Sequence, residues 1–328
     1  NNQLVDYRFL YTSPNKEKIA IASCLNDSYK DLQKKQWQYL LSHKPTSLFL
    51  GGDNIYIKPF KKFYKTINPE FIWDRYIENR NNIDLYKSKT LVPTYAIWDD
   101  NDYGPKNAGR DFKYKQESKD IFLSFFPQTQ HGSIYSRGPG LSMAVTLNGL
   151  NYLFLDNRSF RSKNNDKKEQ SHFGPQQKSW LFSLLGKAKN PVFLISGNQF
   201  FGSHQPFESF SRNHPDAFKR FIRELKKLPA PPVVFISGDR HLVELQDLPR
   251  KILGYKSYEL TTSGMHSNYY PGTATQYPAR YPLYSADGQP NFLILENING
   301  TRTQLNFKAS VFGDSGTQLY SKKLSVKK

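Results

Sequence analysis

Four apolar runs in this sequence end in small, acidic or amide residues, and this repeated pattern limits the fold most strongly. The runs and their endings occupy residues 47–56, 92–100, 191–199 and 233–241. Such a run is typical of a buried strand, and the glycine, serine or aspartate that follows ends it. Ligand groups in α/β sheets lie outside the carboxyl ends of the strands. We therefore expect these turns to converge on one metal site, with Asp53 at its centre.

The order of the predicted elements favours an α/β fold. A strand over 18–23, a helix over 30–43 and a strand over 48–50 form a β-α-β unit, which favours parallel strands. Further helices are predicted over 58–86, 111–126, 174–185 and 215–227, and further strands over 90–98, 133–155 (a hairpin), 191–196, 233–237, 256–262, 292–295, 303–309 and 318–324. The Tyr- and Pro-rich stretch 269–284 reads as a loop. We expect two sheets in a single domain over 1–328, with no separate N-terminal β domain.

The charge balance indicates either an anionic partner or a solvated basic surface. Lys and Arg number 46 against 28 Asp and Glu, a net charge of +18. A phosphoester, a nucleic acid, a lipid headgroup or a polymer phosphate would each suit such a charge. Hydrophobic residues make up 38% of the chain, which is enough for a sizeable core and argues against disorder.

Cysteine usage and hydropathy bear on the location of the protein. Cys24 is the one cysteine, so an intrachain disulfide is excluded. No apolar run approaches the ~18 residues that a membrane-spanning helix needs. The polar start at Asn1 is not a signal peptide. A basic chain that is nearly free of cysteine suits an exported protein, so we expect a secreted or periplasmic location.

The residue types at the strand ends suit a pair of metal ions. A dinuclear phosphoesterase needs several oxygen ligands, an imidazole and one bridging carboxylate, with the metals ~3.5–4 Å apart. Asp53, the pair Asp99 and Asp100, and the pair Asp239 and His241 each follow an apolar run. Because Asp239 and His241 lie two residues apart, both can reach one cavity.

Several motifs in order along the chain resemble the PhoD-like alkaline phosphatase/phosphodiesterase family of the calcineurin-like metallophosphatases. These motifs are Ala22-Ser23-Cys24, Gly52-Asp53-Asn54-Ile55-Tyr56, Trp98-Asp99-Asp100, Leu155-Asp156-Asn157-Arg158, Gly174 to Leu181, Ser237-Gly238-Asp239-Arg240-His241 and Glu259 to Ser263. The match spans most of the chain.

The resemblance implies a four-layer αββα sandwich and a phosphoester hydrolase that uses a metal-bound hydroxide at an iron/calcium-type centre. Cys24 and Tyr56 would bind Fe³⁺, and Asp53 would bridge it to Ca²⁺ or another divalent metal. Three further ligands are implied by position: Asp100, Asp239 and His241. The charge of Fe³⁺ would keep the thiol and phenol ligands deprotonated.

One position departs from the family pattern. Asn101 stands where the family has the histidine that protonates the leaving group or contacts the phosphate. An amide can hydrogen-bond a phosphate oxygen but cannot act as a general acid. Arg158 is retained and would hold a phosphate oxygen bidentately. Further candidates for a metal or substrate contact are Asp99, Asn107, Asn198 and His266.

Each residue also has a structural interpretation. Taken alone, Cys24 would be a small core residue, Asp53 a turn residue, and Tyr56 one of 21 tyrosines in the core. The ordered set of motifs favours metal binding for all three.

Three functions follow as hypotheses. The first is a monomeric phosphomonoesterase or phosphodiesterase that acts on a small phosphoester, a phospholipid or a polymer phosphate. The second, motivated by Asn101, is a catalytically weakened phosphatase-fold protein that binds a phosphate-containing anion. The third is a nucleic-acid binder or nuclease, but no recognition module is present, so we expect no sequence-specific nucleic-acid partner.

Overall fold

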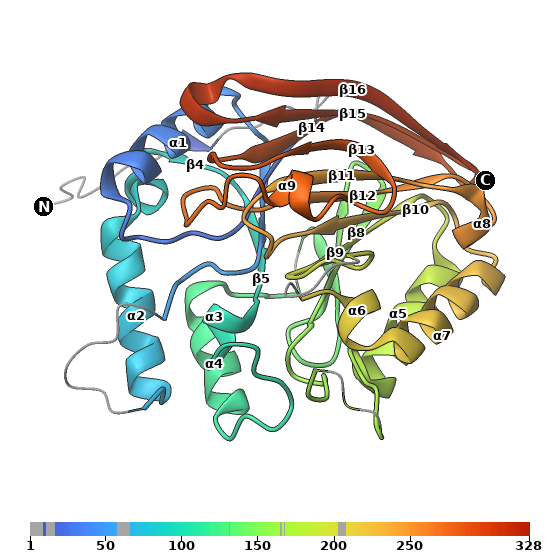
Figure 1. Ribbon diagram of the computed structural model, residues 1–328, viewed down its shortest axis with the longest axis horizontal. Helices are drawn as coiled ribbons and strands as arrows, with labels where there is room; N and C mark the ends of the chain where they lie inside the picture. The colour runs from blue at the N-terminus through green and yellow to red at the C-terminus, as the bar shows by residue number, and fades with distance from the viewer. Residues whose placement is uncertain are drawn as a thin grey trace, which may run out of the picture.

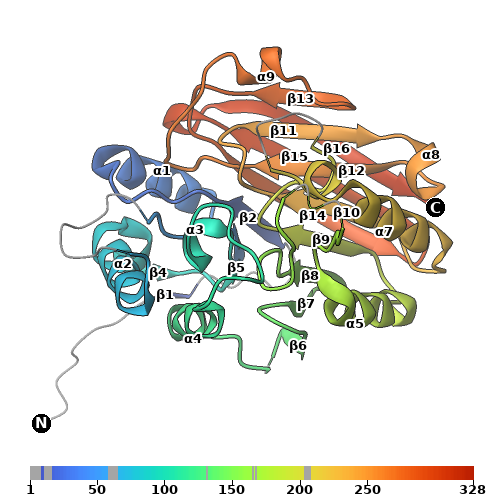
Figure 2. The same ribbon diagram turned by 60° about the horizontal axis from the view of Figure 1, so that its bottom comes forward.

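A computed structural model of the chain describes residues 9–10, 17–57, 66–130, 132–164, 166, 168–202 and 208–328. Two sheets lie between two groups of helices. Figure 2 shows α1 (Lys30–Ser42), α2 (Pro69–Asn82) and α4 (Lys115–Phe125) on one side, and α5 (Gly174–Lys187) and α7 (Pro215–Lys227) on the other. The predicted four-layer αββα architecture is therefore confirmed.

The first sheet combines three strands from early in the chain with three strands from its C-terminal part. Its order is β16-β15-β14-β2-β3-β5, from β2 (Lys18–Ala22), β3 (Ser47–Gly51), β5 (Thr94–Ile97), β14 (Phe292–Thr301), β15 (Gln304–Phe312) and β16 (Gln318–Lys327). Strands β2, β3 and β5 are parallel, and β14 runs antiparallel to β2. Figure 1 shows β14, β15 and β16 side by side. That a single domain covers 1–328 remains a prediction.

The second sheet has the order β13-β11-β12-β10-β9-β8-β7-β6. Its strands are β6 (Ile134–Arg137), β7 (Met143–Leu147), β8 (Leu150–Leu155), β9 (Val192–Ser196), β10 (Val233–Ser237), β11 (Val243–Leu248), β12 (Ser257–Thr262) and β13 (Pro282–Ala286). Strands β8, β9, β10 and β12 are parallel. Every residue of β9 and β10 is buried, as expected for apolar strands covered on both faces.

Aromatic side chains join the facing sheets. The ring of Phe49 on β3 lies 5.1 Å, between centroids, from the rings of both Tyr152 and Phe154 on β8. Phe193 on β9 and Phe307 on β15 have ring centroids 5.7 Å apart. This packing fixes the two sheets face to face, so the ends of their strands lie at a common edge.

Short elements complete the described chain. Strand β1 (Phe9–Leu10) pairs with β4 (Thr90–Leu91). The short helices are α3 (Asp100–Tyr103), α6 (Phe210–Asn213), α8 (Arg250–Leu253) and α9 (Thr273–Gln276), and 3₁₀ turns lie at Asp84–Lys87 and Asp314–Gly316. Among the described residues, no helix is both long and apolar enough to span a membrane.

Some element predictions need correction. The strand predicted over 90–98 divides into β4 and β5 around Pro93, which has no N–H to donate to a ladder. Strand β11 was not predicted, and the expected loop over 269–284 contains α9 and the start of β13. Because β13 is an edge strand, it tolerates Pro282. The helix expected over 111–126 begins at Lys115. Residues 58–65 of the predicted helical region lie outside the described residues.

Candidate metal centre

The carboxyl ends of the parallel strands of both sheets meet at one edge of the molecule. Close backbone approaches join them at glycines. A Cβ atom on Gly238, after β10, would lie 2.5 Å from the carbonyl oxygen of Gly51 on β3. A Cβ atom on Gly197, after β9, would lie 2.6 Å from the carbonyl oxygen of Trp98. Only glycine permits these contacts, so the small residues that end the apolar runs bring the two sheets together.

Several candidate ligands have a left-handed backbone conformation. The φ angle is +61° at Cys24, +52° at Asp53, +72° at Asp239 and +52° at His241. This region is uncommon for residues other than glycine, and such residues cluster at functional sites. The N–H of Cys24 donates to the carbonyl of Gly52 at 3.1 Å, which ties the turn after β2 to the turn after β3.

A first group of candidate ligands contains a thiol, a carboxylate and an imidazole. Ligand atoms of Cys24, Asp53 and His241 all lie within 4.8 Å of one another. The hydroxyl of Tyr56 lies 2.8 Å from Nε2 of His241. The backbone N–H of His241 donates to the Ser263 hydroxyl, which lies 3.7 Å from Sγ of Cys24. We call these residues the thiol–imidazole group: Cys24, Asp53, Tyr56 and His241.

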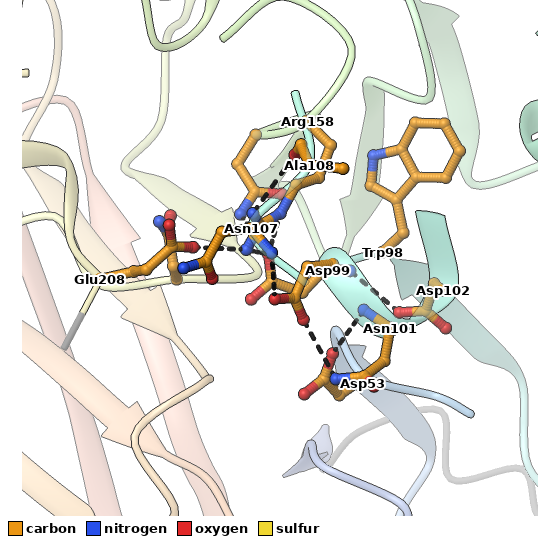
Figure 3. Close-up of polar contacts among 12 residues, drawn as sticks. Asp53, Trp98, Asp99, Asn101, Asp102, Asn107, Ala108, Arg158 and Glu208 are labelled. Atoms are coloured by element: carbon orange, nitrogen blue, oxygen red, sulfur yellow. Dashed lines mark hydrogen bonds and ion pairs between the residues drawn. The ribbon is translucent and has the colours of Figure 1, made fainter. Parts of the chain in front are cut away.

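A second group consists of carboxylates. Oxygens of Asp53, Asp99 and Asp100 lie within 4.8 Å of one another, and Figure 3 shows Asp99 between Asp53 and Arg158. The backbone N–H of Asn107 donates to Oδ2 of Asp100 at 2.8 Å, and that of Asn101 donates to Oδ1 of Asp53 at 3.3 Å. This carboxylate group shares Asp53 with the first group, so Asp53 stands where a bridging ligand would.

Burial and mutual repulsion make this donor set unfavourable without cations. Burial raises the pKa of Asp53 well above its usual range, and the neighbouring Asp100 raises it further. Burial raises the pKa of the Cys24 thiol to about 11. Oδ2 of Asp99 is buried and has no hydrogen-bond partner among the described residues. Clustered carboxylates beside a thiol, a phenol and an imidazole fit a pair of metal ions, because cations would offset the repulsion and occupy the unpaired oxygen.

Asp239 stands apart from both compact groups of ligand atoms. Burial raises the pKa of its carboxyl well above the usual range, and the charge of Asp99 raises it further. The side chain therefore lies within electrostatic reach of the carboxylate group. Its role as a metal ligand stays a prediction.

Arg158 is placed differently from the sequence prediction. Its side chain has no exposed surface. Nε donates to Oδ1 of Asp99 at 2.6 Å, and Nη2 donates to Oε2 of Glu208 at 2.8 Å. The guanidinium thus binds carboxylates inside the protein, and a phosphate contact by Arg158 stays a prediction without support from its geometry.

Asn101 lies beside the carboxylate group. Its Nδ2 donates to Oδ1 of Asp100 at 3.0 Å, and its Oδ1 accepts the N–H of Ile57 at 3.4 Å. The amide has one further N–H to offer a ligand, but no proton that it can transfer.

The remaining candidates have different surroundings. Nε2 of His266 accepts from the indole N–H of Trp37 at 3.1 Å, and Nδ1 lies 3.0 Å from the carbonyl oxygen of Asn26. Both ring nitrogens are thus engaged by protein groups, and a metal or substrate contact by His266 stays a prediction without support from this geometry. Asn198 is buried, with its Oδ1 3.4 Å from the Ser196 hydroxyl. The side chain of Asn107 is exposed.

Residues that the sequence prediction missed also line the site. Glu208 accepts hydrogen bonds from Arg158 and Arg161. The hydroxyl of Ser263 accepts a hydrogen bond from the backbone N–H of His241. The ring of Tyr270, half exposed, stacks on His241 with the centroids 5.8 Å apart and the planes at 9°. Ser263 ends the motif Glu259 to Ser263, and Tyr270 lies in the Tyr-rich stretch 269–284, whereas Glu208 and Arg161 lie outside recognisable motifs and offered no signal.

The sequence itself matches no family model and no curated protein. Solved structures do match the fold. A structure of PhoD superposes with a TM-score of 0.68 at 15% identity, covering 96% of this chain and 72% of PhoD. The purple acid phosphatase PPD1 from yellow lupin seeds superposes with a TM-score of 0.57 at 10% identity, covering 95% of this chain and 54% of that protein.

These similarities establish the fold, since both identities are low. Both solved structures share the architecture that the ordered motifs predicted, over nearly all of this chain. The chain therefore shares the fold of these two solved structures, and the resemblance inferred from the sequence is confirmed at the level of the fold.

Proposed function

We propose that the chain is a metal-dependent phosphoester hydrolase. The observation that carries this proposal is the pair of ligand groups that share Asp53 at the meeting edge of the two sheets. Two cations held by a common carboxylate are suited to hydrolysis by in-line displacement at phosphorus. The names of the two solved structures, PhoD and a purple acid phosphatase, are consistent with this chemistry.

The donor types support Fe³⁺ in the thiol–imidazole group and Ca²⁺ in the carboxylate group. Thiolate, phenolate and imidazole from Cys24, Tyr56 and His241 suit a transition metal, whereas the oxygens of Asp99 and Asp100 suit a hard divalent ion. We propose Asp239 as a further ligand, and Asn107 as a candidate on the Ca²⁺ side. When bound, the two ions would supply Lewis-acid chemistry and make water more acidic.

The protein's own groups orient the substrate. The free N–H of the Asn101 amide would donate to a phosphate oxygen, because its other N–H is already held by Asp100. The leaving oxygen would take its proton from water or from a group other than Asn101. The exposed ring of Tyr270 offers a flat wall beside His241 for the organic part of the ester.

Hydrolysis of nitrophenyl phosphate and bis(nitrophenyl) phosphate tests this function. We expect the purified protein to hydrolyse at least one of them, to lose activity with a chelator, and to regain it with Fe³⁺ and Ca²⁺. Metal analysis should give two ions per chain. Absence of turnover after both metals are restored would exclude the hydrolase.

Asn101 favours a second candidate function, a phosphatase-fold protein that binds a phosphate-containing anion with weak catalysis. This protein would bind inorganic phosphate in calorimetry in the presence of the metals, yet turn over neither nitrophenyl ester. Rapid hydrolysis of either ester would exclude it.

We propose further that the protein is exported and acts as a monomer on phosphoesters. The net charge of +18 supports an anionic substrate such as a small phosphoester, a phospholipid or a polymer phosphate. Steep weakening of substrate binding with added salt would support this electrostatic contribution.

A further inference from the structure

Arg158 lies between two buried carboxylates that come from different parts of the chain. Its neighbours are Asp99, which follows β5, and Glu208, which precedes α6. The side-chain exposure is 0% for Arg158, 1% for Asp99 and 7% for Glu208. Figure 3 shows Arg158 between them, on the side of Asp99 that faces away from Asp53.

The two oxygens of Asp99 differ in their surroundings. Oδ1 accepts hydrogen bonds from Nε of Arg158 at 2.6 Å and from Nδ2 of Asn157 at 2.7 Å, and it forms an ion pair with Nη2 of Arg158. Oδ2 is buried and has no partner among the described residues. A carboxylate oxygen of Asp99 lies within 4.8 Å of oxygens of Asp53 and Asp100. One oxygen of Asp99 is therefore held by Arg158 and Asn157, and the other has no partner among the described residues.

Glu208 fixes Arg158 from the opposite side. Oε2 of Glu208 accepts from Arg158 at 2.8 Å, while Arg161 donates to both oxygens of Glu208, at 2.8 and 3.1 Å. Burial raises the pKa of Glu208, but the charges of Arg158 and Arg161 outweigh it and lower that pKa to about 2. Glu208 is thus a permanent anion that fixes the orientation of the guanidinium.

We propose that Arg158 is a positioning residue that holds Asp99 with its free oxygen toward the metal centre, anchored in turn by Glu208. This inference rests on the proposed metal-dependent function. Three carboxylates at one site repel one another, and a single buried guanidinium offsets that repulsion while its planar fork fixes one of them.

The geometry favours this role over a phosphate contact. All three guanidinium nitrogens of Arg158 already donate inside the protein, the third to the carbonyl oxygen of Ala108 at 3.5 Å. Because Nε and Nη2 are engaged by Asp99 and Glu208, Arg158 could hold a phosphate oxygen bidentately only by releasing one of these carboxylates. Such a release would leave a buried carboxylate unpaired, which is strongly unfavourable.

Titration of the metal-free protein with Co²⁺ tests the proposal without relying on activity. Uptake by equilibrium dialysis gives affinity, and visible absorption reports the geometry of the ligands. Removing a partner that orients a metal ligand costs about 10–100-fold in affinity. We expect Arg158→Met to weaken one of two Co²⁺ equivalents by such a factor, and Asp99→Asn, which changes the ligand itself, to weaken it at least as much. The double variant should lose little more than Asp99→Asn alone, because the two residues act as a unit.

Arg161→Met is the matched control. It removes an equally buried arginine that binds Glu208 without touching Asp99. We expect this variant to lose stability but to keep the wild-type Co²⁺ affinity and spectrum. Arg158→Lys keeps the charge but loses the fork, so its affinity should lie between those of wild type and Arg158→Met.

The outcomes separate the possibilities. Should Arg158→Met fail to fold, the isosteric Asp99→Asn and the charge-retaining Arg158→Lys still decide the question. Folded variants with wild-type Co²⁺ affinity and spectrum would overturn the positioning role. Normal Co²⁺ binding with a raised KM in Arg158→Lys would instead support a phosphate contact. If wild-type protein binds no Co²⁺, the proposed function fails, and the positioning role fails with it.

Discussion

The two groups of candidate ligands that share Asp53 are held in place by different means. The carboxylate group is fixed by a buried ion pair, in which Arg158 holds Asp99. The thiol–imidazole group is held mainly through its backbone: Nε of Arg75 donates to the carbonyl oxygen of Tyr56 at 2.8 Å, and the backbone N–H of His241 donates to the hydroxyl of Ser263.

The difference follows from the charges that each group carries. Asp99 is an acid whose burial needs a counter-charge, and Arg158 supplies it even before a metal binds. Burial raises the pKa of the Cys24 thiol and lowers the pKa of the His241 imidazole, and both shifts favour the neutral side chain. They can therefore be buried without ion pairs. One half of the site is preorganised by charge, the other by backbone geometry.

Replacing the shared residue should disrupt both halves and have the largest effect. Asp53→Asn keeps the shape of the side chain but removes the bridging charge. We expect the metal content to fall below two ions per chain and the hydrolysis rate to drop by ~10³-fold, equivalent to about 4 kcal/mol of transition-state stabilisation. Metal analysis and nitrophenyl ester assays measure both. The exposed Asp31→Asn is the control, and a variant that retains both metals would contradict the bridging role.

Replacing Cys24 should affect the thiol–imidazole group alone. Cys24→Ser retains a donor for the contacts with Ser23 and Ser263. Loss of a ligand itself should cost more than the ~100-fold typical of an outer partner, at one of the two metal ions only. The thiolate-to-metal charge-transfer band of the Co²⁺-loaded protein should disappear. Absence of that band from the Co²⁺-loaded wild-type protein would show that Cys24 is a core residue.

Acid should destabilise the protein near the thiol–imidazole group through protonation of His266. The backbone of His266 pairs with that of Leu25, which is next to Cys24. Burial lowers the pKa of His266 from 6.5 to about 4. As the pH falls, the unfolded chain therefore takes up a proton on His266 before the folded protein does. The contribution of neutral His266 to the free energy of unfolding is complete above pH 6.5 and is lost as the pH falls to 4. The loss should amount to about 3 kcal/mol in the free energy of unfolding.

Urea unfolding at pH 7 and pH 4.5 of wild type and His266→Gln measures this contribution. The wild type should lose more stability between the two pH values than the variant. Equal losses would show that His266 does not titrate in this range.

The smallest expected effect concerns Asn101, which lies against the carboxylate group. Asn101→His restores a side chain that can transfer a proton. General acids contribute ~10²–10⁴-fold in evolved sites, and an introduced one should give less, about tenfold, with poor leaving groups. Asn101→Gln, which keeps an amide, should show no gain. An unchanged rate with both metals intact would argue against a missing acid as the cause of weak catalysis.

Sequence alone was sufficient for the fold class and for where the candidate ligands lie. Asp53, Asp100 and Asp239 each follow an apolar run, and the carboxyl ends of parallel strands meet at one edge of a sheet. That inference needs only local patterns and a general rule of sheet geometry. The two sheets were predicted from such patterns and the four-layer sandwich from the family resemblance, and both are confirmed. The edge strand β13 was missed because its composition is that of a loop.

Only the tertiary structure decided which partners the buried polar residues have. Arg158 binds Asp99, 59 residues away, and Glu208, 50 residues away, and His266 binds Trp37 across 229 residues. An arginine at a strand end looks the same in the sequence whether it faces a substrate or a buried carboxylate. The choice depends on which side chains the two sheets bring together, since a buried charge takes whatever counter-charge the packing supplies.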